Sequence, residues 1–143
     1  MQSLNPQTVP LKDINLIEAS AGTGKTYTIS LLYLRFVLES EPALSVDQIL
    51  VVTYTTAATK ELKDRIRLRL SDALMAFINE DTVGEYADFC ENYERIESIL
   101  RLSRALLNFD EAAIFTIHSF CQRALKDTAF DAGLAFETEL LDN

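Results

Sequence analysis

An apolar stretch that runs into a loop of small residues and then into Gly-Lys-Thr constrains this chain more than any other feature. The run is Leu16-Ile17-Glu18-Ala19-Ser20-Ala21-Gly22-Thr23-Gly24-Lys25-Thr26. It predicts a strand at about 15–19, a loop that curls around an anion, and a helix from 25 to about 39. In such a loop the backbone N–H groups and the helix dipole hold phosphates, Lys25 reaches the β/γ-phosphates, and the Thr26 hydroxyl ligates Mg²⁺. We therefore predict a nucleotide-binding loop.

The first position of this loop departs from the pattern G-x-x-x-x-G-K-[ST], because Ala19 stands where glycine is usual. A methyl group fits there if the residue keeps a negative φ. The alternative is a glycine-rich turn with a stray lysine. A strand, a loop and a helix in the required order favour the phosphate loop.

Composition narrows the class of protein. The chain has 143 residues, of which 48% are hydrophobic, which suits one compact domain or part of a larger one. It has no secretory signal and no apolar run long enough to span a membrane. Cys90 and Cys121 lack the spacing of metal ligands and are expected to be reduced thiols. These features predict a cytoplasmic protein that does not associate with a membrane.

The charges are segregated along the chain. A formal net charge of −9 argues by itself against nucleic-acid binding. Five of the thirteen basic side chains nevertheless fall within ten residues, at Lys60, Lys63, Arg65, Arg67 and Arg69. Residues 72–97 contain eight acidic residues and a single basic one, Arg95. The chain can therefore present a local positive surface, although both runs are also compatible with solvated helix faces.

Apolar periodicity predicts further elements in the order β-α-β-α-α-β-α. A second strand at 49–53 has no polar alternation, which predicts a parallel strand buried on both faces. A third strand is predicted at 112–117, followed by a helix at 118–128. Two helices lie between these strands, one from about 56 and one over 85–107. Their predicted apolar faces consist of Ala58, Leu62, Ile66, Leu70, Leu74 and Phe77 or Ile78, and of Phe89, Tyr93, Ile96, Leu100 and Leu107.

This order is that of an α/β nucleotide-binding fold with a parallel sheet flanked by helices. Only three strands are expected, and no apolar strand ends in the carboxylate that holds Mg²⁺ in such enzymes. The candidate Leu140-Leu141-Asp142 has too little strand before it. We therefore expect the sheet to be incomplete and the chain to be the first part of a longer protein.

Two further segments place polar residues where a parallel strand ends and a helix begins, which is where ligands bind in such sheets. Thr53, Tyr54 and Thr55 follow the second strand, and Thr116-Ile117-His118-Ser119 follows the third. Hydroxyls, an aromatic ring and helix N-terminal N–H groups suit phosphates and stacked bases. A single histidine is more often structural, but the position of His118 just beyond a strand favours a binding role.

Together the three segments resemble motifs I, Ia and Ib of superfamily 1 DNA helicases of the UvrD/Rep type. Ala-x-x-Gly-Thr-Gly-Lys-Thr is similar to motif I, which has Ala at its first position in this family. The segment Thr53–Ile66 resembles motif Ia, with Tyr54 where Phe is usual, and Thr-Ile-His-Ser-Phe-Cys resembles motif Ib. Residues 16–29 and 115–125 are most similar to the RecB branch, the beta subunit of exodeoxyribonuclease V. The AddA branch and the UvrD/Rep enzymes are the alternatives.

The resemblance implies that residues 1–143 form the N-terminal part of a RecA-like helicase domain 1A, with a helical insertion at about 72–110 that faces solvent or a partner subunit. It implies an ATP- and Mg²⁺-dependent 3′–5′ DNA helicase/exonuclease subunit in double-strand-break repair and recombination. Its partners would be single-stranded or duplex-end DNA and RecC- and RecD-like subunits. We expect the segment alone to be inactive. A P-loop kinase or small NTPase without a DNA role, or a binding module only, are the alternatives from other classes.

The resemblance also assigns roles to residues. Lys25 would compensate charge in the transition state, and Thr26 would hold Mg²⁺. The role of Gln7, as a possible reader of adenine, stays open. The phosphates would be held by Ala19, Ser20, Ala21, Gly22, Thr23, Gly24, Lys25 and Thr26. DNA would be contacted by Thr53, Tyr54, Thr55, Thr116, His118 and Ser119, with Lys60, Lys63 and Arg65 as candidates for its phosphates.

Overall fold

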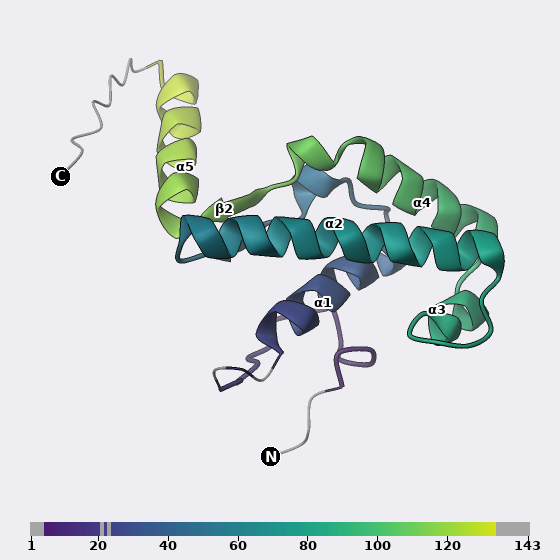
Figure 1. Cartoon of the computed structure of the whole chain (residues 1–143). Coiled ribbons are helices and arrows are strands. Elements are labelled where there is room, and N and C mark those ends of the chain that lie inside the picture. The colour runs from purple at the N-terminus through teal and green to yellow at the C-terminus, as the bar shows by residue number, and fades with distance from the viewer. Residues whose placement is uncertain (1–4, 21, 23, 134–143) are drawn as a thin grey trace.

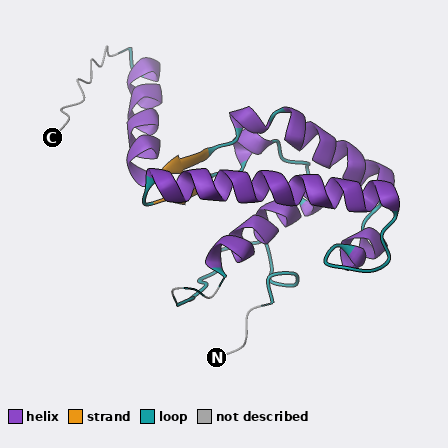
Figure 2. Cartoon of the chain, in the orientation of Figure 1, coloured by secondary structure: helices purple, strands orange, loops and turns teal. Residues whose placement is uncertain are grey.

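The computed structural model describes residues 5–20, 22 and 24–133. Within these residues, helices form most of the regular structure and two short strands form the rest (Figures 1 and 2). None of the described helices is long and apolar enough to cross a membrane. The elements are α1 Lys25–Glu39, β1 Val51–Thr53, α2 Thr56–Asn79, α3 Ala87–Asn92, α4 Arg95–Leu107, β2 Ile114–Thr116 and α5 Ile117–Asp131, with 3₁₀ turns η1 Val46–Gln48 and η2 Phe109–Glu111.

The two strands pair in parallel, in the register Val51↔Ile114, Val52↔Phe115 and Thr53↔Thr116. Figure 2 shows them beside the N-terminal end of α2. A parallel pair requires a crossover, which α2, α3 and α4 provide. The structure is therefore a mixed α/β fold, and the predicted parallel pairing is confirmed.

The strand predicted at 15–19 is absent, so the described residues contain two strands where three were predicted. A strand forms only if a neighbour completes its ladder of hydrogen bonds, and no described segment pairs with these residues. As a result Leu16 is 86% exposed. The candidate 140–142 lies outside the described residues.

The prediction that the second strand is buried on both faces is also wrong. Successive side chains of a strand point to opposite faces. Val51 packs against the core, whereas Val52 and the preceding Leu50 are exposed. The described helices thus cover one face of the pair and leave the other open.

The core lies where α1, α2 and α4 pack against one another (Figure 1). The apolar stripe predicted on α2 is largely confirmed, because Leu62, Ile66 and Leu70 are buried there, with Phe77 completing the face. Ala58 and Ile78 instead face solvent. The largest fully buried side chains are Tyr33, Phe77, Leu31, Leu34, Ile66, Leu70, Leu102, Ile114, Val37 and Val46.

The single helix predicted over 85–107 is two helices, α3 and α4. Tyr93 has an extended backbone (φ −115°, ψ 146°), and its hydroxyl donates a hydrogen bond to Glu39 of α1. Glu94 then starts α4, because its carboxylate accepts the N–H groups of Ile96 at 3.0 Å and Glu97 at 2.6 Å. A tertiary contact and a new N-cap therefore break the helix.

The apolar face predicted for this helix is wrong in its second half. Ile96, Leu100 and Leu107 are exposed, whereas Leu102 and Ala105 are buried. The break at Tyr93 gives α4 its own orientation, which turns Leu102 and Ala105 toward α1 and α2.

Two arginines of α4 fix this orientation by binding carbonyls at the C-terminal ends of α1 and α2. Arg101 donates to the carbonyls of Leu38 at 3.2 Å and Ser40 at 2.8 Å, and Arg95 donates to that of Phe77 at 2.9 Å. Carbonyls at the end of a helix lack the regular partner four residues later, and the Phe77 carbonyl accepts, besides Arg95, the Glu80 N–H at 3.4 Å. The predicted insertion therefore packs into the core and does not only face solvent.

Protonation of the Glu94 cap should be visible at two amides. Hydrogen bonds from the N–H groups of Glu97 and Ile96 lower the pKa of Glu94 from its ordinary 4.5. Because the folded pKa is depressed, the cap stabilises α4 above pH 4.5 and is lost as the pH falls through the folded pKa. In an NMR pH titration we expect the amide shifts of Ile96 and Glu97 to move together with a midpoint below 4.5. Glu94→Ala should remove this titration, and a midpoint above 4.5 would contradict the assignment.

Candidate nucleotide and nucleic-acid site

The start of α1 differs from the start of the other long helices. The N-cap residues Thr55 of α2, Glu94 of α4 and Thr116 of α5 each accept a first-turn N–H with their side chain. Gly24 of α1 has no side chain to do so. The first-turn N–H groups of α1 therefore lack a side-chain cap from the N-cap position, which is the arrangement that binds anions at helix N-termini.

Two glycines shape the approach to α1. Gly22 has φ 79° and Gly24 has φ 82°, both in the left-handed region that other residues rarely adopt. The Gly24 carbonyl accepts the first helical hydrogen bond, from the Thr28 N–H at 2.9 Å. The helix predicted to start at Lys25 is thus confirmed. Ala21 and Thr23 of the predicted loop lie outside the described residues.

An open pocket of about 910 Å³ lies between this segment and α1. It brings together Ala19, Ser20 and Lys25 of the predicted phosphate loop, beside an apolar wall from α1 and Ile17. Lys25 is exposed and forms no ion pair with a described residue, so its charge is available to a ligand. Thr26 is half-buried on the first turn and does not line the pocket. The lining residues are Ile17, Glu18, Ala19, Ser20, Lys25, Thr28, Ile29 and Leu32.

The predicted motif Ia and motif Ib residues meet at the carboxyl ends of the two strands. Thr53 and Thr116 are register partners. Thr55 caps α2 by accepting the Ala58 N–H at 3.1 Å, and Thr116 caps α5 by accepting the Ser119 N–H at 3.1 Å. In Figure 1 the starts of α2 and α5 meet at the left, and the start of α1 is the lower left end of that helix, below them. The structure therefore builds two similar turns on adjacent strands.

Most of the hydroxyls in these turns are already bonded to protein. The Thr53 hydroxyl contacts that of Thr59, which also donates to the Thr55 carbonyl at 3.0 Å. The Thr116 hydroxyl donates to that of Ser119 at 2.9 Å. Their role in the fold is to shape the turns. Threonine is a common N-cap residue, so its place just before each helix is the sequence signal for this capping role.

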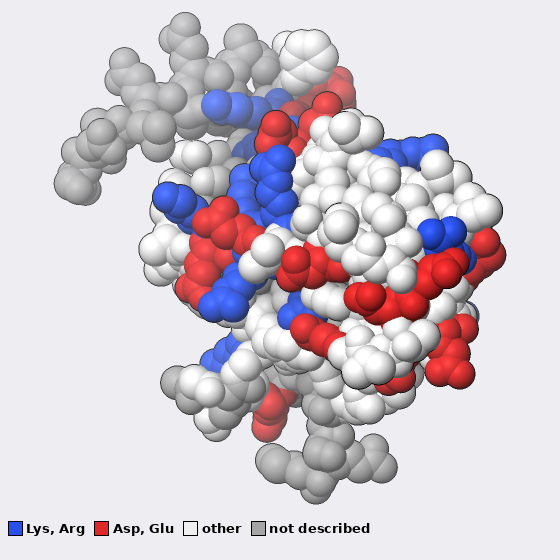
Figure 3. All heavy atoms as spheres, turned by 45° about the vertical axis from the view of Figure 1, so that its right-hand side comes forward, with Lys and Arg blue, Asp and Glu red and all other residues white. Residues whose placement is uncertain are grey.

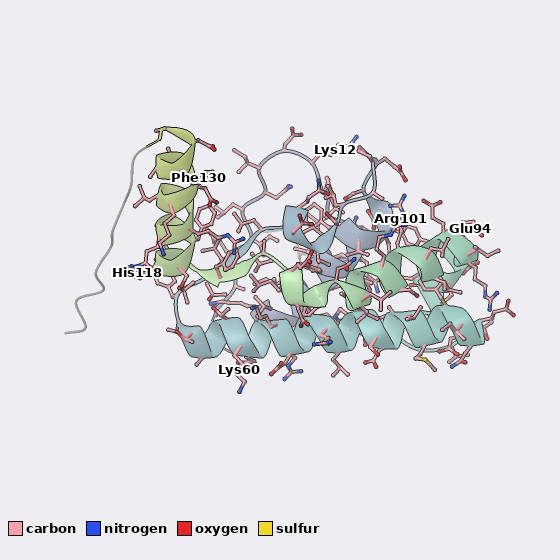
Figure 4. The ribbon with its side chains drawn as sticks, turned by 90° about the horizontal axis from the view of Figure 1, so that it is seen from above. Lys12, Lys60, Glu94, Arg101, His118 and Phe130 are labelled. Carbon is pink, nitrogen blue, oxygen red and sulfur yellow. The ribbon has the colours of Figure 1, made fainter. Side chains whose placement is uncertain are left out.

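Tyr54 and His118 are the side chains that project from the two turns. Tyr54 is 90% exposed, and His118 is also exposed. Neither forms a hydrogen bond or ion pair with a described residue. Figure 4 shows His118 at the N-terminal end of α5 and Lys60 near that of α2. An aromatic ring, an imidazole and a lysine thus stand at one end of the molecule.

The basic run of α2 does not form one surface. Arg69 is 10% exposed and pairs with Glu85 at 2.7 Å, and Arg67 lies 3.8 Å from Asp110. Lys60 and Arg65 are exposed and pair with no described carboxylate. Because they are five residues apart, Lys60 and Arg65 lie on different faces of the helix. The structure therefore leaves Lys60 near the two turns and does not bring Arg65 to the same face.

Charge is also segregated on the surface. Figure 3 shows carboxylates running across the centre of the face that contains α3 and the C-terminal end of α2, with several Lys and Arg side chains to their left. This acidic surface lies at the opposite end of α2 from Tyr54 and His118. The negative net charge of the chain therefore does not argue against nucleic-acid binding at the two turns.

Gln7 is not among the residues that line the pocket. Its N–H donates to the Asn5 side chain at 3.0 Å. Arg35 of α1 fixes this lead-in by donating to the carbonyls of Pro6 at 3.0 Å and Val9 at 2.7 Å. Within the described residues Gln7 is thus held in the lead-in and not at the pocket, and its role stays a prediction.

Comparison with known proteins identifies relatives over nearly the whole chain. Residues 2–143 match the model of the UvrD/REP helicase N-terminal domain. The chain is 48% identical to the RecBCD enzyme subunit RecB of Haemophilus influenzae over 96% of its length, and 42% identical to that of Escherichia coli over 99%. It is 35% identical to the Mycobacterium tuberculosis RecB subunit over 90% of its length. The chain spans 13% of the length of the first two relatives and 12% of the third.

Proposed function

The chain belongs to the UvrD/REP helicase family, and from this premise we propose that it is the N-terminal ATP-binding segment of a RecB-like 3′–5′ DNA helicase/exonuclease subunit. The observation that carries the proposal is the pairing of Thr53 with Thr116, which joins two helix-starting turns on adjacent parallel strands. Nucleic-acid phosphates and bases suit such turns. The start of α1 lies below these turns in the view of Figure 1.

ATP phosphates fit the start of α1. The residues assigned to them are Ala19 to Thr26, with the first-turn N–H groups of α1 as donors and Lys25 as the counter-charge. Held by the Thr26 hydroxyl and the phosphates, Mg²⁺ would supply further positive charge. Lys25 would stabilise the negative charge that develops on the transferred phosphoryl group.

DNA binding is assigned to the two turns at the strand ends. Tyr54 offers a ring on which a base can stack, and His118 offers an imidazole on the neighbouring turn. Lys60 and Arg65 are assigned to backbone phosphates, from different faces of α2. The hydroxyls of Thr53, Thr55, Thr116 and Ser119 hold the turns in shape and direct their main-chain groups toward DNA.

In this proposal residues 1–143 form part of a RecA-like domain 1A with a P-loop NTPase fold, and the insertion at 72–110 belongs to its core as much as to its surface. The full protein would act in the cytoplasm in double-strand-break repair, together with RecC- and RecD-like subunits. The RecB name of the three relatives above supports the RecB branch over the AddA and UvrD/Rep branches.

Single-stranded DNA should distinguish this function from that of a nucleotide-binding protein without a DNA role. In the full-length protein, we expect Tyr54→Ala to weaken single-stranded DNA binding about 5- to 150-fold, because a stacked base contributes about 1–3 kcal/mol. His118→Ala should weaken it less. Fluorescence anisotropy with a labelled oligonucleotide at low and high salt measures both effects, and binding should fall as salt rises.

Phe130→Ala is the matched control, because Phe130 is an equally exposed aromatic residue at the other end of α5 (Figure 4). It should leave DNA binding unchanged. Equal affinities for wild type, Tyr54→Ala and Phe130→Ala would refute the DNA assignment.

A further inference from the structure

Arg69 of α2 is a charged residue that the proposed DNA contacts do not use. Its side chain is 10% exposed, unlike that of Arg67 two residues earlier, which is 56% exposed. Burial of a guanidinium is unfavourable unless its donors are bonded, so the partners of Arg69 show what it holds together.

On one side, Arg69 binds the first turns of α1. Its Nε donates to the Ser30 hydroxyl at 2.8 Å, and that hydroxyl donates to the Tyr27 carbonyl at 2.8 Å. The guanidinium also stacks on the Tyr27 ring, 4.5 Å from its centroid. Tyr27 is two residues from Lys25, so these contacts hold the turn that presents the phosphate loop.

On the other side, Arg69 is fixed by the segment between α2 and α3. Its Nη1 lies 2.7 Å from the Glu85 carboxylate and 3.5 Å from the Tyr86 hydroxyl. A hydrogen bond from Arg69 is the largest cause that lowers the pKa of Glu85, which keeps this carboxylate ionised. The Tyr27 hydroxyl also hydrogen-bonds to Glu85. The start of the acidic segment is therefore tied to the first turn of α1 both through Arg69 and through Tyr27.

We infer that Arg69 is a positioning residue for the phosphate loop, which it holds through Tyr27 and Ser30 while Glu85 holds Arg69. This inference rests on the proposed ATP site. Arg69 does not act by attracting ATP directly, because its guanidinium is already bonded to protein groups. What it supplies is the orientation of the first turn of α1, and hence of the N–H groups and Lys25, relative to α2.

The test uses the full-length protein and compares Arg69→Ala with Arg67→Ala, which removes the same charge from a neighbouring position whose partners are Asp110 and the Phe109 ring. We expect Arg69→Ala to raise the KM for ATP about fivefold or more, because a misaligned loop loses part of its phosphate contacts. Arg67→Ala should stay within about twofold of wild type. Arg69→Lys should restore only part of the loss, because lysine lacks the planar fork that reaches several partners at once.

If Arg69 only stabilised the fold in general, Arg69→Ala would weaken ATP binding and DNA binding alike. The DNA-binding turn at the start of α2 has its own cap, so nucleotide-free DNA affinity should change less than about twofold in Arg69→Ala. An equal loss of ATP and DNA binding, or an unchanged KM for ATP, would overturn the inference.

Glu85→Gln decides the question if Arg69→Ala does not fold, because it keeps the side-chain size and removes the charge that fixes Arg69. It should raise the KM for ATP by about twofold to threefold, and no change would overturn the inference. Lys25→Ala separates this failure from failure of the ATP site. If Lys25→Ala abolishes ATP binding while the Arg69 variants do not affect it, the positioning role of Arg69 is refuted and the proposed ATP site is retained.

Discussion

Replacing Lys25 with alanine is expected to reduce ATP hydrolysis by the full-length protein about 10²- to 10³-fold. This is the usual cost of removing one preorganised group that stabilises charge in a transition state. Lys25 is the first residue of α1, lines the 910 Å³ pocket, and pairs with no described carboxylate. Its ammonium charge can therefore act on a bound phosphate without first breaking an internal salt bridge. Steady-state phosphate release in the presence of single-stranded DNA measures the effect.

Lys12→Ala is the matched control for this prediction. Lys12 is an exposed lysine of the lead-in that does not line the pocket at the start of α1. It lies instead near Arg35 and Glu39, at the other end of α1 (Figure 4 labels it). The two variants make the same change in net charge, so a difference between them reports position and not charge. Hydrolysis by Lys25→Ala within about tenfold of the Lys12→Ala rate would exclude Lys25 from the transition state.

The features that the sequence predicted well depend on local signals. The helix predicted over 25–39 is α1, Lys25–Glu39, because the left-handed Gly24 starts it and its apolar spacing fits a buried face. The parallel pairing of the strands at 51–53 and 114–116 follows from the β-α-β order. Since carboxyl ends of parallel strands share an edge, the proximity of the segments after Thr53 and Thr116 was predictable as well.

The errors arise where contacts distant in sequence decide the structure. The strand predicted at 15–19 needs a ladder partner, which its own residues cannot provide. The helix predicted over 85–107 is broken by Tyr93, whose partner Glu39 is 54 residues away. The new cap, Glu94, is not among the residue types that most often start helices, so the sequence gives only a weak signal for it.

The basic run of α2 illustrates the same limit. Five positive side chains look equivalent in the sequence, but their roles differ in the structure. Arg69 bonds to Ser30, 39 residues earlier, and to Glu85, 16 residues later. Neither partner is recognisable from the run itself. Periodicity separates Lys60 from Arg65 on the helix surface, but only tertiary contacts separate half-buried Arg69 from exposed Arg67.

A second large effect is expected on stability, at Arg35. Its side chain is 7% exposed and binds both carboxylate oxygens of Glu39, at 2.6 and 2.9 Å. It also satisfies the carbonyls of Pro6 and Val9. Arg35→Ala would leave a partly buried carboxylate without its counter-ion and two carbonyls without a donor. We expect it to lower the free energy of unfolding by about 3 kcal/mol, within the range measured when one member of a buried pair is removed.

Arg67→Ala provides the comparison, because it removes the same side chain from an exposed pair. Arg67 lies 3.8 Å from Asp110, which is 95% exposed, and such pairs contribute about 0–1 kcal/mol. Urea unfolding followed by circular dichroism measures both variants, and raising the salt concentration should reduce only the small Arg67 effect. Similar losses in the two variants would mean that the Arg35–Glu39 pair is solvated and that the lead-in is held to α1 by other contacts. A loss confined to Arg35→Ala would identify this one arginine as the residue that fixes the lead-in on α1.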